Sequence, residues 1–171
     1  MRAFPVTMRA FMTAGIVGSW MAVAIGCHHA SRTSSATIEA DSLTGIVSVT
    51  GTAFEQRLVL RSGEIATPLS AATSDSAALS RLGGVEIVVI GRRTSNHFRV
   101  ERFTAVSVAG APVADGFVRN DGGRLVLETA RGSIPLGNPP TALRGMIGAR
   151  IWIGGPLGTG PNTYGVIVPV R

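Results

Sequence analysis

The feature that most constrains the fold is an internal repeat, because repeated segments in a fixed order indicate two copies of one structural unit. Arg57-Leu58-Val59-Leu60 recurs as Arg124-Leu125-Val126-Leu127, and Pro68-Leu69 recurs without a gap as Pro135-Leu136. The other matches keep the same order: Gly45-Ile46-Val47 with Gly116-Phe117-Val118, Ala78-Leu79 with Ala142-Leu143, Gly84-Val85-Glu86-Ile87 with Gly148-Ala149-Arg150-Ile151, and Gly91 with Gly155. The pattern predicts two homologous units, 42–110 and 114–171, joined at Ala109-Gly110-Ala111-Pro112.

Each unit is expected to contain five short strands. In the first unit we expect them at 45–49, 57–61, up to Pro68-Leu69, 85–90 and 98–108. Their counterparts are 116–119, 124–128, up to Pro135-Leu136, 149–153 and 164–170, and Leu58, Leu60, Leu125 and Leu127 should face the core. Asp121-Gly122-Gly123 predicts a tight hairpin between the first two strands of the second unit, since Gly and Asp tolerate positive φ.

The only helical candidate is 74–82, between the third and fourth strands of the first unit. Ser74 or Ser76 is the expected N-cap, and Gly83-Gly84 should end the helix. In the second unit this segment shrinks to a turn or a single helical turn within 139–146.

Five strands with a helix between the third and fourth is the order of an OB-fold barrel. The cadence of an opening Gly-x-Val, Leu-x-Leu, Pro-Leu and a later Gly-x-x-Ile resembles small OB-like domains of bacterial lipoproteins and periplasmic proteins without an assigned function. The resemblance implies an all-β fold with a minor helix, built as two tandem OB-like small β-barrels. A single β-sandwich of about ten strands is the alternative. Barrels of about 65 residues are marginal alone, so we expect the two units to pack together.

The N-terminal segment 1–26 has the features of a secretory signal peptide. Arg2 and Arg9 precede an apolar run, 10–25, that is short for a membrane span. Ala24-Ile25-Gly26-Cys27 resembles the lipobox of bacterial lipoproteins, although family members more often carry Leu where Ala24 stands. The resemblance implies cleavage before Cys27 and a diacylglycerol on its sulfur. A retained membrane anchor, or a plain signal followed by a buried cysteine, is the alternative.

The residues after Cys27 indicate the location. Cys27 is the only cysteine, so no intramolecular disulfide can form. In lipoproteins of bacteria with two membranes, Asp after the lipidated Cys favours the inner membrane; His28 stands here, so the resemblance implies a lipid-anchored outer-membrane protein, facing the periplasm. The segment 27–41 should be a tether. Without 1–26 the formal net charge falls from +6 to +4, because Arg2 and Arg9 are removed. This is an ordinary charge for solubility.

The sequence offers little for catalysis, and we expect no enzyme activity, catalytic residue or cofactor. Of three histidines only His97 lies in the folded part, so a Ser-His-Asp triad would depend on it. His28-His29 lacks a third ligand nearby, and we expect no metal site. The glycine-rich stretch 154–161 has no helix after it, which favours a hairpin loop over a phosphate loop. The carboxylates are scattered as solvated charges usually are: Glu55, Glu64, Asp75, Glu86, Glu101, Asp115, Asp121 and Glu128.

One charged cluster is the candidate ligand-binding surface. It surrounds the hairpin between the fourth and fifth strands of the first unit and contains Arg92, Arg93, His97, Phe98, Arg99 and Arg102. Such a cluster would suit single-stranded nucleic acid, but export argues against that partner. An anionic envelope polymer, a lipid headgroup or a protein partner fits better. The alternative is a set of solvated strand-edge charges that discourage edge pairing.

The predicted function is therefore that of a lipid-anchored envelope protein acting as a non-enzymatic binding or scaffolding module. The alternative is a ligand-sensing or carbohydrate-binding lipoprotein with a pocket between the two units, involving Trp152 and Tyr164. Trp152 is also a candidate core residue, because it alternates with Ile151 and Ile153 on an expected strand.

The lipid anchor is tested by Cys27→Ser. Without the sulfur that accepts the diacylglycerol, the chain should remain an unprocessed precursor and incorporate no labelled fatty acid. The measurement is metabolic labelling followed by electrophoresis. Unchanged labelling of the variant would rule out Cys27 as the anchor.

Overall fold

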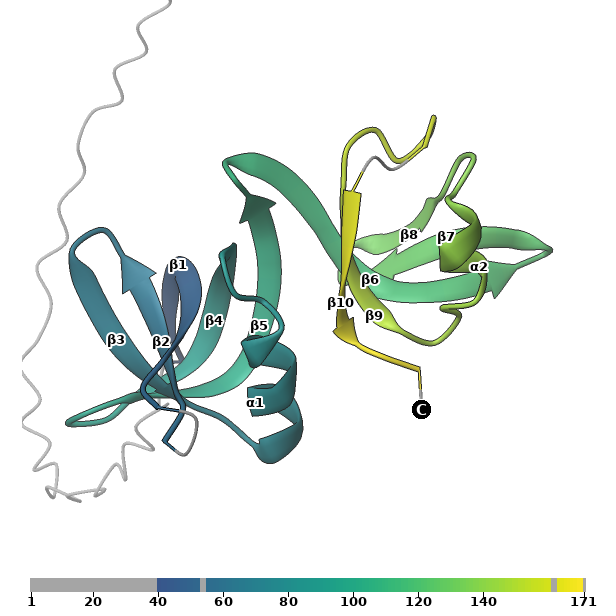
Figure 1. The fold of residues 1–171 in the computed structure, drawn as a ribbon. Helices are drawn as coiled ribbons and strands as arrows, with labels where there is room; N and C mark the ends of the chain where they lie inside the picture. The colour runs from purple at the N-terminus through teal and green to yellow at the C-terminus, as the bar shows by residue number, and fades with distance from the viewer. Residues whose placement is uncertain (1–39, 53–54, 161–162, 171) are drawn as a thin grey trace, which may run out of the picture. The chain divides into compact units, whose positions relative to one another are not determined.

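A computed structural model describes residues 40–52, 55–160 and 163–170 of the chain. Of the described residues, 58% lie in strands and 9% in helices, and the strands are mostly antiparallel (Figure 1). The prediction of an all-β fold with a minor helix is confirmed. The predicted signal peptide, Cys27, and the tether before Ala40 lie outside the described residues.

The elements follow one another in the same order twice. We call β1–β5 with α1 the first half: β1 Asp41–Thr50, β2 Arg57–Ser62, β3 Ile65–Ser70, α1 Thr73–Ser80, β4 Val85–Arg93 and β5 Phe98–Val108. We call β6–β10 with α2 the second half: β6 Ala111–Asp121, β7 Arg124–Thr129, β8 Gly132–Pro135, α2 Thr141–Arg144, β9 Arg150–Gly154 and β10 Thr163–Val168. Each expected strand is present. The expected tether is one residue too long, because Asp41 already belongs to β1.

The first half closes into a ring of five strands. β1 pairs with β2 and β4, β2 pairs with β3, and β4 pairs with β5, all antiparallel. The parallel pairing of β3 with β5, at Leu69 with Phe98 and Ser70 with Arg99, completes the ring. Each of the five strands therefore pairs with two neighbours, although the closing contact spans only two residue pairs.

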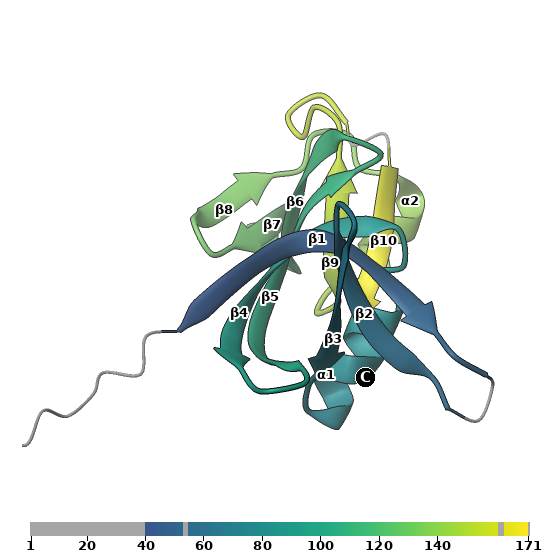
Figure 2. The ribbon, with the colours of Figure 1, turned by 90° about the vertical axis from the view of Figure 1, so that its left-hand side faces the viewer.

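β1 serves two partners by bending. Its residues Asp41–Ile46 pair with β4 and its residues Ile46–Thr50 pair with β2. Figure 2 shows the resulting long, curved strand. Gly45 lies at the bend, where a Cβ atom would overlap the carbonyl oxygen of Arg61. Glycine is therefore required for this close approach of two backbones.

The second half repeats this arrangement up to its closure. β6 pairs with β7 and β9, β7 pairs with β8, and β9 pairs with β10. Among the described residues β8 pairs with β7 alone. A loop takes the place of the closing strand: the N–H of Gly137 donates to the carbonyl oxygen of Leu157 at 2.9 Å. That loop connects the antiparallel strands β9 and β10, as expected for the stretch 154–161.

Corresponding residues of the two halves make corresponding contacts. Leu60 lies opposite Val47, and Leu127 lies opposite Val118. The N–H of Gly84 donates to the carbonyl oxygen of Val47 at 3.0 Å, and that of Gly148 donates to Val118 at 2.9 Å. The repeat seen in the sequence thus extends to the register of the strands.

The predicted turn between β6 and β7 is present, whereas the predicted N-cap of α1 is not. Gly122 and Gly123 have φ values of 56° and 85° and form the predicted turn between β6 and β7. The expected N-cap of α1 is wrong, because Ala72 occupies the cap and no side chain caps the helix. The Ser76 hydroxyl instead donates to the carbonyl oxygen of Ala71 at 3.2 Å.

The core consists of two clusters of buried apolar side chains. The first includes Leu60, Leu79, Ile87 and Phe98, and the second includes Leu127, Leu143 and Ile151. The fully buried Ile167 of β10 belongs to the first cluster, so the last strand of the second half helps to complete the core of the first. β5 and β6 are directly linked by the turn at Ala109-Gly110.

Equivalent leucines should be equally important to folding. Leu60→Ala and Leu127→Ala should each lower the free energy of unfolding by about 2 to 5 kcal/mol, because each leaves a cavity in a buried cluster. The exposed neighbours provide controls, and Arg61→Ala and Glu128→Ala should cost under about 1 kcal/mol. The measurement is urea-induced unfolding of the chain. A large loss for one leucine and none for the other would show that the two positions are not equivalent.

Candidate functional site

The predicted arginine cluster lies on the hairpin formed by β4 and β5. Arg92 and Arg93 are the last residues of β4 and lie opposite Arg99 and Phe98. The turn between the strands is closed by the N–H of Thr94, which donates to the carbonyl oxygen of His97 at 2.9 Å. The Thr94 hydroxyl donates to the same oxygen at 2.7 Å. The hairpin tip is therefore held by its own hydrogen bonds.

Phe98 belongs to the core rather than to the surface. Its side chain is fully buried within the first cluster. Residues alternate between the two faces of a strand, so Arg99 next to it points outward. The expected contribution of the Phe98 ring to a ligand surface thus has no support in the structure.

Carboxylates neutralise part of the cluster. Arg92 Nε lies 3.0 Å from Glu101 Oε1, and Arg93 Nε lies 3.5 Å from Asp41 Oδ2. All four side chains are about half exposed, so these pairs contribute little to stability. Arg99 and Arg102 are exposed and form no ion pair with any described residue. The positive charge of the hairpin is consequently concentrated on β5.

Three of the predicted residues line one hollow beside the closure of the ring. It has a volume of about 770 Å³, and Arg92, His97 and Arg99 share it with Ser70, Asp75 and Glu101. Arg93 and Arg102 are not among its lining residues. Guanidinium donors and carboxylate acceptors therefore face the same space, which suits a ligand that has both acidic groups and hydroxyls.

The geometry around His97 differs from that of a catalytic triad. His97 Nδ1 lies 2.8 Å from Asn96 Oδ1, where a triad would place a carboxylate. Within the described ranges, no group of three or more His, Cys, Asp or Glu side chains is placed to hold a metal ion. His28 and His29 lie outside the described residues.

A buried ion pair that the sequence analysis missed joins the two halves. Arg150 Nε and Nη2 donate to Asp115 Oδ1 and Oδ2, both at 2.8 Å. The Asp115 side chain is only 2% exposed, so its assignment to the solvated charges is wrong. The N–H of Ala105 on β5 donates to Asp115 Oδ2 at 2.8 Å. Arg150 Nη2 also donates to the Phe103 carbonyl oxygen at 2.6 Å, and the guanidinium lies 4.5 Å from the Phe103 ring centroid.

These contacts make the pair structural. Both carboxylate oxygens accept hydrogen bonds, and the guanidinium is shared between a carboxylate, a carbonyl oxygen and an aromatic ring. One signal in the sequence could have revealed it: Arg150 stands where the first unit has Glu86, a reversal of charge at equivalent strand positions.

Trp152 and Tyr164 pack against different clusters of apolar side chains. Trp152 lies opposite Gly165, and a Cβ atom at Gly165 would overlap its indole ring. Trp152 packs against the first cluster, whereas Tyr164 packs against the second. The predicted pocket between the units therefore lacks the joint contribution of these two aromatic side chains.

Comparisons with protein-family models, curated proteins and solved structures found no match to this chain. No helix within the described ranges is long and apolar enough to cross a membrane. The chemistry of the described side chains is therefore the basis for a functional proposal.

The buried pair should matter far more than an exposed pair of the same geometry. Asp115→Ala should lower the free energy of unfolding by about 3 kcal/mol, because it leaves Arg150 partly buried without its partner. Arg119 and Glu128 provide the control, since Nε and Oε2 are also 2.8 Å apart but both side chains are about half exposed. Glu128→Ala should cost under about 1 kcal/mol. Equal losses in urea-induced unfolding would contradict a structural role for Asp115.

Proposed function

We propose that the protein is an outer-membrane lipoprotein, anchored through Cys27 and facing the periplasm, that acts as a non-enzymatic binding or scaffolding module. The lipobox-like Ala24-Ile25-Gly26-Cys27 and the following His28 support the anchor and the location. The five-stranded ring with α1 between β3 and β4 supports an OB-like first unit. The matching registers of the second half support a second, less regular unit.

The hollow at the β4–β5 hairpin carries the binding proposal. Arg99 points outward without an ion pair among the described residues and is available to a ligand carboxylate or phosphate. Glu101 and Asp75 line the same hollow and can accept hydrogen bonds from ligand hydroxyls. An anionic envelope polymer with a polyhydroxylated backbone has both kinds of group. We therefore favour an acidic glycan as its partner.

Other partners fit the same surface less well. Single-stranded nucleic acid is usually held by aromatic side chains on which bases stack. Phe98 is buried, and none of the described residues that line the hollow is Phe, Tyr or Trp. The His97 imidazole is the one aromatic ring among them. An anionic lipid headgroup lacks an extended array of hydroxyls from which Glu101 and Asp75 could accept hydrogen bonds. A sugar pocket between the two units has less support, because Trp152 and Tyr164 pack against different clusters.

The binding proposal is tested by Arg99→Gln on an immobilised acidic polysaccharide, polygalacturonate. Loss of one charge-assisted hydrogen bond should weaken binding about tenfold or more. Binding of the unmodified chain should also fall with rising salt, since exposed charges are screened over about 8 Å at physiological ionic strength. The melting temperature should stay unchanged, because Arg99 is exposed.

Arg131→Gln is the matched control, since Arg131 is an exposed arginine that does not line the hollow. Neutral dextran and vesicles containing phosphatidylglycerol serve as the other two supports. Equal retention of Arg99→Gln and the unmodified chain at low salt would assign the cluster to solvated charge. Stronger retention on the vesicles than on the polysaccharide would overturn the glycan in favour of a lipid headgroup.

A further inference from the structure

One charged residue is identical in the two copies of the repeat. Among the matched residues Arg57 and Arg124 are the only pair of identical charged residues, whereas the other identical residues are apolar or glycine residues that serve the core and turns. Both arginines are exposed. Arg57 has one loose ion pair, 3.9 Å from Glu55, and Arg124 has none among the described residues. Folding therefore gives no reason for keeping an arginine at this position.

Each of these arginines lines a pocket, and the two pockets lie at equivalent places. The pocket of the first half has a volume of about 370 Å³ and that of the second about 550 Å³. Four matched pairs of residues line both: Arg57 and Arg124, Leu58 and Leu125, Pro68 and Pro135, and Leu69 and Leu136. The segments that are most similar between the two copies of the repeat thus line one pocket in each half.

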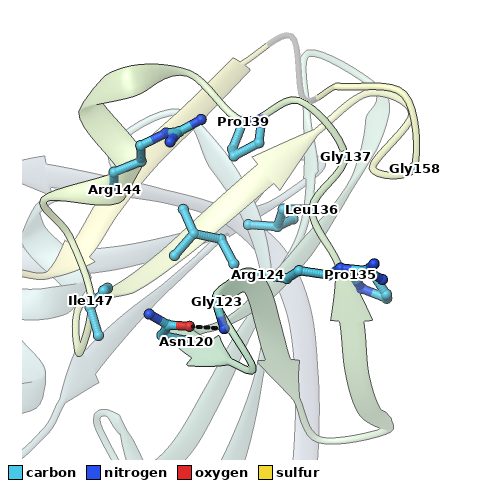
Figure 3. Close-up of a pocket in the computed structure, with 11 residues that line it drawn as sticks. Asn120, Gly123, Arg124, Pro135, Leu136, Gly137, Pro139, Arg144, Ile147 and Gly158 are labelled. Carbon is cyan, nitrogen blue, oxygen red and sulfur yellow. Dashed lines mark hydrogen bonds between the residues drawn. The ribbon is translucent and has the colours of Figure 1, made fainter.

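The chemistry of the pockets is that of a site for an apolar ligand with an acidic group. The leucines and prolines form an apolar lining, and none of the described residues that line either pocket is a carboxylate. In Figure 3 the Arg124 side chain extends beside Pro135, whereas Arg144 extends toward Pro139 on the other side of the pocket. Asn120 Oδ1 is occupied by the N–H of Gly123 at 2.9 Å. Both volumes fall in the range of about 300 to 1,000 Å³ that is usual for small-molecule sites.

We propose that each half binds one amphiphilic organic anion, with its apolar part against the Leu-Pro lining and its acidic group on Arg57 or Arg124. The second pocket should bind more tightly. Arg144 follows the matched Leu143 there, whereas Ser80 follows Leu79 in the first half. The Ser80 hydroxyl donates to the carbonyl oxygen of Ala77 at 2.8 Å and carries no charge. These sites are additional to the proposed glycan site, since neither pocket shares a lining residue with the hollow at the β4–β5 hairpin.

The experiment titrates the chain with decanoate and follows the leucine methyl signals by NMR. The signals of Leu58 and Leu69 should report on one site, and those of Leu125 and Leu136 on the other. Arg57→Gln should weaken the first site and Arg124→Gln the second, each about tenfold or more, without affecting the other. Arg144→Ser should lower the affinity of the second site, and Ser80→Arg should raise that of the first. Arg61→Gln is the control and should change neither.

Three further probes identify the ligand chemistry. Octyl glucoside supplies an apolar chain without charge, inorganic phosphate supplies charge without a chain, and both should bind at least tenfold more weakly than decanoate. Decyl phosphate distinguishes the sources of the anion: a preference for it indicates a lipid phosphate, and a preference for decanoate indicates a carboxylate. Equal binding of octyl glucoside and decanoate, or decanoate affinities unchanged in both Arg57→Gln and Arg124→Gln, would overturn the proposal. Polygalacturonate binding is measured on the same variants, so this failure is distinguishable from failure of the glycan site.

Discussion

The first strand of each half pairs with two neighbours, and the rest of the fold depends on the glycine where it bends. In β1 this is Gly45, and in β6 it is Gly116, where a Cβ atom would overlap the carbonyl oxygen of Arg61 or Glu128. Without this approach the strand could not leave β4 or β9 and continue along β2 or β7. The bend therefore brings the inner faces of the strands together over a buried cluster, and it explains why both units open with Gly-x-Val.

Differences between the halves are as informative as their likeness. Where the first half has Glu86, the second has Arg150, and this arginine reaches Asp115 and the backbone of β5. Where the pairing of β3 with β5 closes the first ring, the described residues of the second half have a loop at that place, with a hydrogen bond from the N–H of Gly137 to the carbonyl oxygen of Leu157. The second half is thus less regular than the first and contacts it through Arg150. Arg57 and Arg124, by contrast, are the same residue at equivalent exposed positions.

The sequence predicted features that depend on local pattern and missed those that depend on packing. β5 runs over 98–108 as expected, and Gly122-Gly123 forms the expected turn, because alternation and glycine chemistry are local signals. The burial of Asp115 depends on Ala105 and Arg150 meeting it in space, and the charge reversal from Glu86 to Arg150 was the one local signal of it. The prediction that Phe98 belongs to the surface cluster is wrong, and the alternation of strand residues already places Phe98 and Arg99 on opposite faces of β5. The paired pockets were invisible in the sequence, because strand register and a helix assemble them.

Amide hydrogen exchange measured by NMR tests most directly the claim that the chain is one unit built twice. The N–H of Gly84 bonds to Val47 and that of Gly148 bonds to Val118, and both acceptors belong to fully buried residues. Since these bonds join equivalent strands to the turns after equivalent helices, both amides should exchange slowly, with comparable protection. Strong protection of one and none of the other would contradict the account, because the two halves would then not share a structure.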